Sequence, residues 1–249
     1  MITQYHRPKT LTEALTLIAQ PKTYPLGGGI KLNQFSNDEY AVVDLQALGM
    51  NFVEKKGSTL EIGATATLQD LLDSPDTPEA LKKAIQHEAS LNTRNIATVA
   101  GTLVASDGRS PFVTMMMALD AKITLHNTSN EEENVQVGDF LPMHEELLKN
   151  KLITQISISS NTNSAYEYVA RTPADKAIVC AALTQWSAGR TRLVIGGWGE
   201  SPSLAMDGKG AEGIEIAAKN AAHDATDQWA SAEYRQDVAA TLAKRCLEK

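Results

Sequence analysis

Cysteine is scarce in this sequence, which has only Cys180 and Cys246 among its 249 residues. Two thiols cannot supply the four thiolates that a typical iron-sulfur cluster requires. Apolar residues form no run close to the ~20 that cross a bilayer, basic residues form no cluster that would attract nucleic acid, and the first residues show no secretory signal. We therefore expect a cytoplasmic protein with reduced cysteines that inserts into no membrane and binds no nucleic acid.

Positive charge is also in short supply, with 23 lysine and arginine residues against 30 aspartate and glutamate residues and a formal net charge of −7. Such a balance gives no long-range attraction for a polyanion, so a bound phosphate would have to be held by local groups. Hydrophobic residues make up 43% of the chain, which suffices for a packed core. The length suits one large domain or two small ones.

Several catalytic and nucleotide-binding motifs are missing from the sequence. It has no GxxxxGK[ST] phosphate loop, no HExxH zinc motif and no GxSxG nucleophile turn. The glycines at 27–29 do not extend to GxGxxG, because Leu32 stands where the last glycine would be, so a nicotinamide-binding Rossmann fold is not indicated. The five histidines are scattered without metal-ligand spacing, which indicates surface or hydrogen-bonded core histidines. We therefore predict no catalytic side chain and no metal site.

Short strands and helices alternate along the chain without a strict βαβ repeat, which favours an α+β fold over a doubly wound one. Thr10 and Thr67 are each followed three residues later by an acid, the spacing of a capping box, and predict helix starts. Pro78 is expected at the first position of a helix capped by Thr77. We predict strands over 23–26, 41–45, around 60–62, 122–125, 152–158, 166–170, 177–183 and 192–195, and helices that begin at residues 11, 68, 78, 111, 211 and 231.

The stretch over residues 157–164, rich in serine and asparagine, is the best candidate for a domain boundary. Before it, the methionines at 115–117 are predicted to fill the core. After it, the chain changes to strands followed by helices. In the last helix four residues recur at intervals of four, which predicts a core position for Cys246 instead of a reactive thiol; they are Tyr234, Val238, Leu242 and Cys246.

Two glycine-bearing turns stand out, PLGGGIKL over residues 25–32 and TVAGTL over residues 98–103. Consecutive glycines permit positive φ and allow the backbone to approach a ligand closely, and successive amides in such a turn form a concavity that suits an anion. Thr98 and Thr102 add hydroxyl donors to the second turn. A phosphate is the predicted ligand of both turns, although isolated glycine turns are also common as purely structural features.

The order of four segments along the chain resembles the FAD-binding, or medium, subunits of the molybdenum hydroxylases, which include the carbon monoxide dehydrogenase and xanthine dehydrogenase groups. The segments are GGGIKL, TRNIATVAGTLVAS, MALDAKITL and SAEYRQDVAATLAKRCL, of which RNIAT and SAEYR are the most specific parts. The resemblance implies an FAD-binding domain of the vanillyl-alcohol-oxidase (PCMH) type over residues 1–160, with two α+β subdomains over about 1–55 and 56–160. A C-terminal α+β domain over 161–249, similar to that of the carbon monoxide dehydrogenase flavoprotein, is expected to follow.

The same resemblance implies which residues hold the cofactor. The two glycine turns would grip the FAD diphosphate, a residue after the second turn would contact the ribityl chain, and an aromatic residue at the start of the C-terminal domain would lie near the isoalloxazine or be a half-buried strand aromatic. The predicted cofactor-binding residues are Pro25, Leu26, Gly27, Gly28, Gly29, Ile30, Lys31, Leu32, Thr98, Val99, Ala100, Gly101, Thr102, Asp107, Ser110 and Tyr166.

Three positions depart from the usual pattern of this family. GGGIKL stands in place of AGG(T/S)DL, so Ile30 and Lys31 occupy the hydroxyl and acidic positions. Pro111 occupies the position of the aspartate that binds the ribityl chain in many members, which leaves Asp107 or Ser110 as substitutes. Tyr168 stands where a lysine is often found. Flavin affinity or redox tuning is therefore expected to differ from that of relatives.

The resemblance implies an oxidoreductase subunit for electron transfer. Electrons from a molybdopterin large subunit would pass through iron-sulfur clusters of a small subunit to the FAD of this chain, and from there to NAD+ or another acceptor. The shortage of cysteine fits clusters on a separate chain. Two alternatives are a free-standing flavin reductase on the same fold and a flavin-free scaffold subunit.

Overall fold

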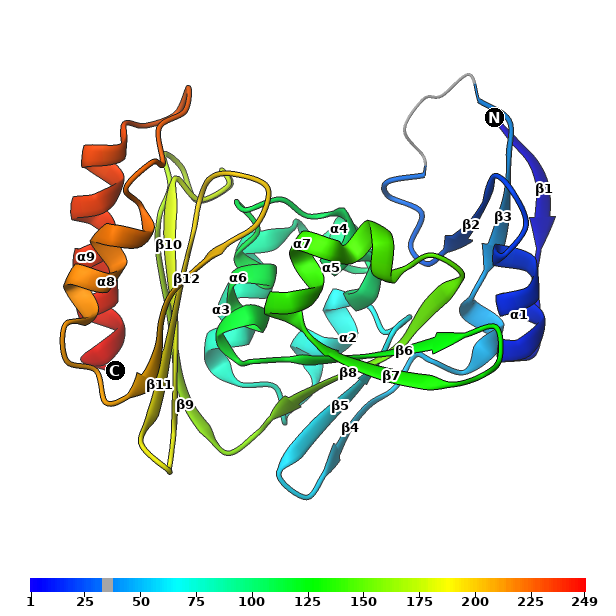
Figure 1. The fold of residues 1–249 in the computed structure, drawn as a ribbon, viewed down its shortest axis with the longest axis horizontal. Coiled ribbons are helices and arrows are strands. Elements are labelled where there is room, and N and C mark those ends of the chain that lie inside the picture. Colours follow the sequence, from blue (N-terminus) through cyan, green and yellow to red (C-terminus); the bar gives the residue numbers. More distant parts are fainter. Residues whose placement is uncertain (33–37) are drawn as a thin grey trace.

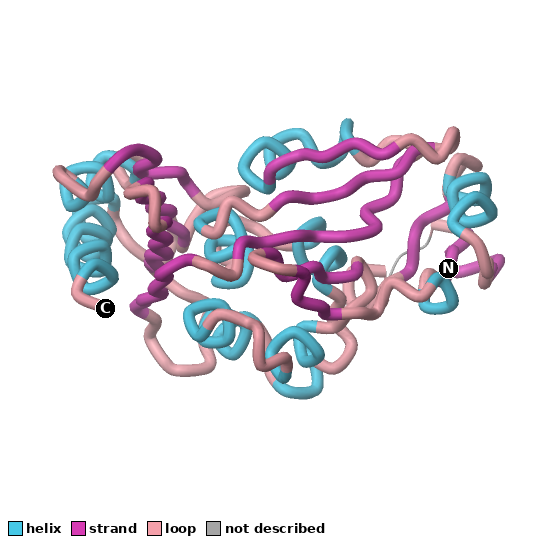
Figure 2. The backbone as a smooth tube through the Cα atoms, turned by 90° about the horizontal axis from the view of Figure 1, so that it is seen from below, coloured by secondary structure: helices cyan, strands magenta, loops and turns pink. Residues whose placement is uncertain are grey.

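The structure is a computed structural model that describes residues 1–32 and 38–249. The described residues form three sheets, which follow one another along the chain and lie from right to left in Figure 1. Figure 2 shows the same elements from below, with the long strands of the second sheet across the middle of the molecule. The α+β class predicted from the sequence is confirmed.

The first sheet has three parallel strands. The first glycine turn follows its edge strand β2 (Thr23–Leu26). The strand order is β1-β3-β2, and helix α1 returns the chain from β1 to β2. Thr10 caps α1 by accepting a hydrogen bond from the amide of Glu13, as the capping-box spacing predicts. The elements are β1 (Ile2–His6), α1 (Leu11–Ile18), β2 (Thr23–Leu26), β3 (Tyr40–Asp44) and a turn of 3-10 helix, η1 (Gln46–Leu48).

The second sheet has five antiparallel strands in the order β4-β5-β8-β6-β7. Side chains alternate along these strands, so Ile156 and Ile158 point into the helix-covered core while Ser157 lies on the opposite face. The strands are β4 (Val53–Lys56), β5 (Thr59–Gly63), β6 (Lys122–Asn127), β7 (Glu132–Gln136) and β8 (Lys151–Ser159). The helices are α2 (Leu68–Asp73), α3 (Glu79–Glu88), α4 (Leu91–Arg94), α5 (Val99–Ala105), α6 (Pro111–Ala118) and α7 (Val137–Leu147).

The third sheet is antiparallel, in the order β12-β11-β10-β9, and helices α8 and α9 pack on one of its faces. Its other face packs on α3 and α6, so the sheet is covered on both sides. The elements are β9 (Thr162–Val169), β10 (Val179–Trp186), β11 (Arg190–Gly196), β12 (Ser203–Lys209), α8 (Ile214–Ala221) and α9 (Ala232–Leu247).

The main hydrophobic core extends from the second sheet into the third. It includes the methionines of α6, which are buried as predicted, and also Tyr166, Cys180 and Val194 of the third sheet. Polar contacts join the same two parts: the Gly197 amide donates to the Gly108 carbonyl over 2.8 Å, and two arginines of β11 pair with Asp120 of the second-sheet region.

Several local predictions need correction. Thr77 does not cap α3, because its hydroxyl donates to the Leu71 carbonyl instead and Pro78 takes the capping position. Tyr234 is 45% exposed and so lies outside the core, whereas Leu242 and Cys246 of the same helix are buried. The elements that were not predicted are strands β1, β4, β7 and β12, helices α4, α5 and α7, and the 3-10 turn η1.

Candidate functional site

The first glycine turn leaves the end of β2 as an open loop. Its start is anchored because the Leu26 carbonyl accepts a hydrogen bond from the Leu45 amide over 3.1 Å. Its far end is anchored because the Tyr40 hydroxyl donates to the Leu32 carbonyl over 2.8 Å. Between them Gly29 has a φ of 74°, a conformation that favours glycine. The turn is thus held at both ends by β3 and the residues around it.

The structure brings the first glycine turn against the second. A Cβ atom on Gly28 would lie 1.7 Å from the carbonyl oxygen of Ile96, and one on Gly27 would lie 2.7 Å from Oγ1 of Thr98. No side chain fits at Gly28, since the obstacle is backbone. The two segments that the sequence predicts to share one ligand are therefore in direct contact.

The amides of the second turn are used within the protein. Thr98 caps α5, and this short helix begins by pairing with the segment that follows β5. The hydrogen bonds run from the amides of Val99 to Ala66 O (2.8 Å), Ala100 to Ala64 O (3.3 Å), Gly101 to Thr98 Oγ1 (3.2 Å) and Thr102 to Thr98 O (2.8 Å). The Thr102 hydroxyl also donates to the Thr98 carbonyl, over 2.8 Å.

The amides of the first turn differ in this respect from those of the second. None of the amides from Gly27 to Lys31 donates a hydrogen bond to a group within residues 1–32 and 38–249. Lys31 is exposed and forms no ion pair with any residue that the structure describes. Successive unpaired amides beside a cation form a concavity suited to an anion. Such amides can donate hydrogen bonds to an anion such as a phosphate.

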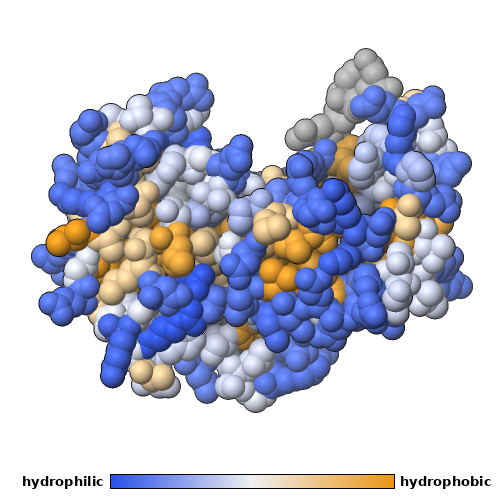
Figure 3. Space-filling model, in the orientation of Figure 1, coloured by the Kyte–Doolittle hydropathy of each residue, from blue (hydrophilic) through white to orange (hydrophobic). Residues whose placement is uncertain are grey.

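Exposed apolar side chains surround the contact between the two turns. Ile30 is 43% exposed, Leu91 of α4 is 56% exposed and Ile96 is 52% exposed. The outline of the surface dips along the upper edge of Figure 3, between the C-terminal sheet region and the part that carries the first sheet, and α4 lies near this edge in Figure 1. A phosphate site edged by apolar surface suits a nucleotide with a flat aromatic ring, such as FAD.

Two of the predicted ribityl contacts lie beyond the far end of α5. Asp107 is exposed, accepts a hydrogen bond from the Arg109 amide and lies 3.5 Å from Lys176 Nζ. Ser110 is fully buried; its hydroxyl caps α6 by accepting from the Val113 amide and donates to Glu88 over 2.6 Å. The Ser110 hydroxyl therefore uses its proton and one acceptor position within the protein, and its ribityl contact stays a prediction. Asp107 remains a prediction.

Tyr166 is part of the core, not of an open site. It is almost wholly buried, and its hydroxyl forms a 3.0 Å hydrogen bond with Nδ1 of His87. Burial raises the pKa of the Tyr166 hydroxyl well above its ordinary value. The neighbouring Tyr168 stacks on His87 with ring centroids 3.7 Å apart. Of the two interpretations of Tyr166, the structure favours a strand aromatic, and one more deeply buried than expected.

His87 and Glu88, two residues that sequence reasoning did not single out, hold α3 against its neighbours. Burial is the main cause that lowers the pKa of His87, and the same cause raises the pKa of Glu88. Glu88 also accepts a hydrogen bond from the Phe112 amide over 3.0 Å, at the start of α6. No sequence pattern marks either residue, because their partners come from distant segments.

The two most specific sequence signatures have structural roles. Arg94 of RNIAT donates to the Ala89 carbonyl over 2.7 Å and fixes the short helix α4 beside the contact between the turns. Arg235 of SAEYR is fully buried and pairs with Asp227 over 2.8 Å. It also donates to the Ile178 carbonyl over 3.1 Å. Arg94 thus positions a segment beside the two turns, whereas Arg235 positions segments of the C-terminal region.

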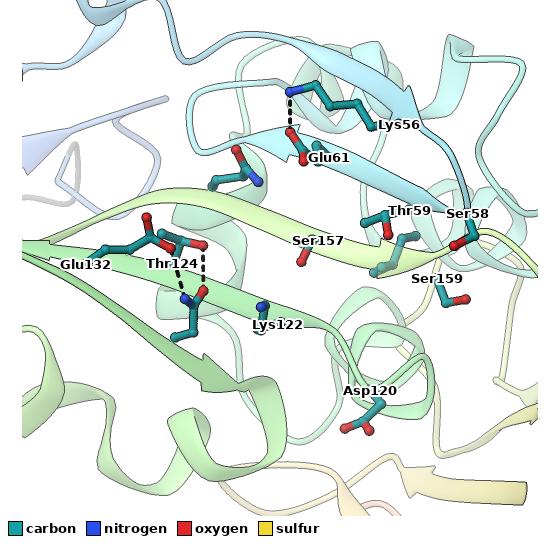
Figure 4. A pocket seen from close by; sticks show the side chains of 13 residues that line it. Lys56, Ser58, Thr59, Glu61, Asp120, Lys122, Thr124, Glu132, Ser157 and Ser159 are labelled. Atoms are coloured by element: carbon teal, nitrogen blue, oxygen red, sulfur yellow. Dashed lines mark hydrogen bonds and ion pairs between the residues drawn. The ribbon is translucent and has the colours of Figure 1, made fainter.

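A second hollow, of about 460 Å³, lies on the uncovered face of the five-stranded sheet. Its side chains are hydroxyls, amides and charged groups, and several pair with one another: Lys56 with Glu61 over 2.7 Å, and Thr124 with Asn134 over 3.0 Å (Figure 4). This face resembles the solvated side of an ordinary antiparallel sheet. No motif in the sequence predicts a site on this face.

No helix in the described part of the chain is long and apolar enough to cross a membrane. Among residues 1–32 and 38–249, no three histidine, cysteine or acidic side chains are grouped so that they could hold a metal ion. Both cysteines are buried thiols.

Known proteins are similar to this chain over most of its length. Residues 1–160 match the family described as FAD binding domain in molybdopterin dehydrogenase. The uncharacterized protein YgfM of Escherichia coli K12 is 29% identical over 202 residues, which cover 79% of this chain and 75% of YgfM. The glyceraldehyde dehydrogenase medium chain of Sulfolobus acidocaldarius is 29% identical over 224 residues, covering 82% of this chain and 78% of that protein.

Solved structures share the whole fold. Quinoline 2-oxidoreductase from Pseudomonas putida 86 superposes with a TM-score of 0.79 at 22% identity, covering 98% of this chain and 95% of the other. Carbon monoxide dehydrogenase from Hydrogenophaga pseudoflava superposes with a TM-score of 0.79 at 23% identity, covering 98% and 96%. At these identities the likeness shows the fold alone.

Proposed function

Because this chain belongs to the family of FAD-binding domains in molybdopterin dehydrogenases, we propose that it carries electrons from an iron-sulfur partner subunit through FAD to NAD+ or another acceptor. It is an oxidoreductase flavoprotein subunit. The partners that we propose are a small subunit with iron-sulfur clusters and a large subunit with molybdopterin, since relatives such as the glyceraldehyde dehydrogenase protein are named medium chains. The two buried cysteines are too few to build a typical cluster in this chain.

The proposal rests on the amides from Gly27 to Lys31, which donate to no group in the described parts of the chain and lie against Ile96 and Thr98. These amides would hold the FAD diphosphate, and the exposed side chains of Ile30 and Ile96 would lie against its apolar parts. When bound, FAD supplies a carrier that accepts and releases electrons. The residues of this chain would bind and orient it. No acid or base side chain is needed for that role.

We also propose that the chain is organised into an FAD-binding domain of two subdomains and a C-terminal domain. Residues 1–55 and 56–160 form the two subdomains that hold FAD, and residues 161–249 form the C-terminal domain. Each of these parts contains one of the three sheets, apart from the first residues of β4, which begins at Val53.

The test is the composition of the purified protein. We expect the chain, expressed with the genes that adjoin its own, to purify with iron and molybdenum and to show the absorption bands of flavin. Flavin bands and acceptor reduction by a chain without partner subunits would support the free-standing reductase instead. A colourless chain that also fails to take up added FAD would refute both flavin functions and leave a scaffold subunit.

A further inference from the structure

Three connections of the C-terminal region converge on the loop over residues 106–110, which follows α5. The Gly108 amide donates to the Gly199 carbonyl over 3.0 Å, and the Gly108 carbonyl accepts from the Gly197 amide over 2.8 Å. A Cβ atom on Gly108 would lie 1.9 Å from the carbonyl oxygen of Trp198. The turn between β11 and β12 therefore fits closely against the backbone at Gly108, where no side chain has room.

Arg109 contacts the other two connections with its side chain. Its Nε and Nη2 groups donate to the carbonyls of Ala177 and Lys176, each over 3.2 Å, in the connection between β9 and β10. Its guanidinium lies over the ring of Trp229, 5.0 Å from the ring centroid, in the connection between α8 and α9. Because a guanidinium presents its donors in a rigid, planar fork, these contacts fix the position of the loop relative to both connections.

Arg235 holds the same three connections together from inside the C-terminal region. It donates to the Ile178 carbonyl over 3.1 Å and to the Gly197 carbonyl over 3.4 Å. Its ion pair with Asp227 fixes a carboxylate that also accepts from the Trp229 amide over 2.7 Å. The connections therefore meet the loop as one assembled surface, and they all lie beyond residue 160, where the family match ends.

The loop lies at the far end of the short helix that starts at the contact between the two glycine turns. Helix α5 has seven residues, so the loop begins about 10 Å from Thr98, which lies against Gly27. A dinucleotide held at the turns extends beyond them, and one of its ends can reach the loop. The same loop carries Asp107, which is exposed and is the predicted ribityl contact.

We infer that the C-terminal region positions the flavin end of FAD through the loop over residues 106–110, with Arg109 as the positioning residue. The adenosine diphosphate end of FAD is left to the two glycine turns. This inference rests on the proposed function. It gives the C-terminal region a part in orienting the cofactor that does not depend on any contact of that region with the diphosphate.

The first variant, Arg109→Gln, removes the guanidinium and keeps a polar side chain. The full chain, freed of flavin, is titrated with FAD and with ADP, and the visible circular dichroism of bound flavin and the melting temperature are recorded. If even one loop residue has to be ordered during binding, we expect FAD to bind at least about fivefold more weakly, and ADP to bind within about twofold of wild type. The dichroism of bound flavin should change. Arg109→Lys, which keeps the charge and can donate to one of the two carbonyls, should recover part of the loss.

The second variant, Trp229→Ala, removes the ring that lies against Arg109, and it carries little risk to folding because Trp229 is 38% exposed. Loss of a cation–π contact at an exposed site corresponds to about a two- to fivefold fall in FAD affinity, and the flavin dichroism should change as in Arg109→Gln. The matched control is Trp186→Ala, which removes the ring beneath Arg190 at the opposite end of β10. It should leave FAD affinity and flavin dichroism unchanged.

The outcomes separate the inference from the proposed function. Equal losses of FAD and ADP affinity in Arg109→Gln would overturn the inference, because the whole site would then be disturbed. Wild-type FAD affinity and dichroism in both variants would overturn it as well, and if Arg109→Gln does not fold, Trp229→Ala decides alone. In each of these cases wild-type FAD binding still supports the proposed function, whereas a wild-type chain that binds no FAD would overturn both.

Discussion

The contact between the two glycine turns can be tested by adding one methyl group at Gly28. The added Cβ would lie 1.7 Å from the Ile96 carbonyl oxygen and 3.3 Å from Cα of Ala97. Carbon and oxygen atoms that are not bonded to each other stay about 3.3 Å apart or more, so the two segments must separate by roughly 1.5 Å. Ala97 also accepts a hydrogen bond from the Leu68 amide over 2.8 Å, which this separation would strain.

Overpacking of this kind costs about 1–3 kcal/mol, and a weakened backbone hydrogen bond adds about 1 kcal/mol. We therefore expect Gly28→Ala to lower the free energy of unfolding by about 3 kcal/mol. In a chain of this length that corresponds to a fall in melting temperature of about 6–12 °C. FAD affinity should fall at least tenfold, because the turn with the amides from Gly27 to Lys31 would move away from Ile96 and Thr98. Gly28→Val should lower both the free energy of unfolding and the FAD affinity further.

The assays are thermal unfolding and flavin titration on the same preparations. Gly208→Ala is the control, because a Cβ there meets no atom within 4 Å, and it should unfold within about 0.5 kcal/mol of wild type. If Gly28→Ala unfolded like this control and retained full FAD affinity, the turns would not be in contact, and the argument for the site would be wrong.

Three further predictions concern the C-terminal region and its docking. Arg235→Ala should lower the free energy of unfolding by about 3–5 kcal/mol, measured by urea titration, because it leaves the Ile178 and Ala225 carbonyls without their buried donor and removes a large, fully buried side chain; an effect below 1 kcal/mol would contradict this. The lowered pKa of His87, caused mainly by burial, means that its stabilising contribution is present above the ordinary histidine value and is lost as pH falls through the lowered pKa. His87→Phe, which keeps a ring against Tyr168, should therefore unfold with a flatter pH dependence between about pH 7 and 5, and an unchanged slope would refute the assignment. Burial raises the pKa of Cys180 to about 11 and of Cys246 to about 12, so neither thiol should react with a thiol reagent at pH 8 until the protein is unfolded, and a native-state reaction of either would contradict their burial.

Elements with local signals were predictable from the sequence. The capping residues Thr10 and Thr67 both act as their spacing predicts, and the methionine helix α6 is buried throughout. The unpredicted strands lack such signals. β1 is exposed along most of its length and β7 consists largely of polar residues, so neither has the alternation of a half-buried strand; only pairing with distant neighbours makes them strands.

The candidate site also has features that the sequence predicts and features that it does not. That glycines 27–29 form a special turn was predictable, since their conformational freedom is a property of the residues themselves. Why Gly28 must be glycine was not, because the obstacle is the Ile96 carbonyl, which comes from a segment far along the chain. The burial of Ser110 and Tyr166 was not predictable either. The hydroxyl of Ser110 forms a hydrogen bond with Glu88 and that of Tyr166 with His87, and no local sequence pattern connects these partners.

The family match ends at residue 160, but the main core does not end there. Tyr166, Cys180 and Val194 of the C-terminal sheet pack into the same cluster as the α6 methionines. A chimera joined at residue 160 to the C-terminal part of a relative would therefore have to match side chains across one continuous interior. The end of the family match is therefore a poor place to cut the protein. Residues 1–160 expressed alone would expose this apolar face, and we expect them to aggregate.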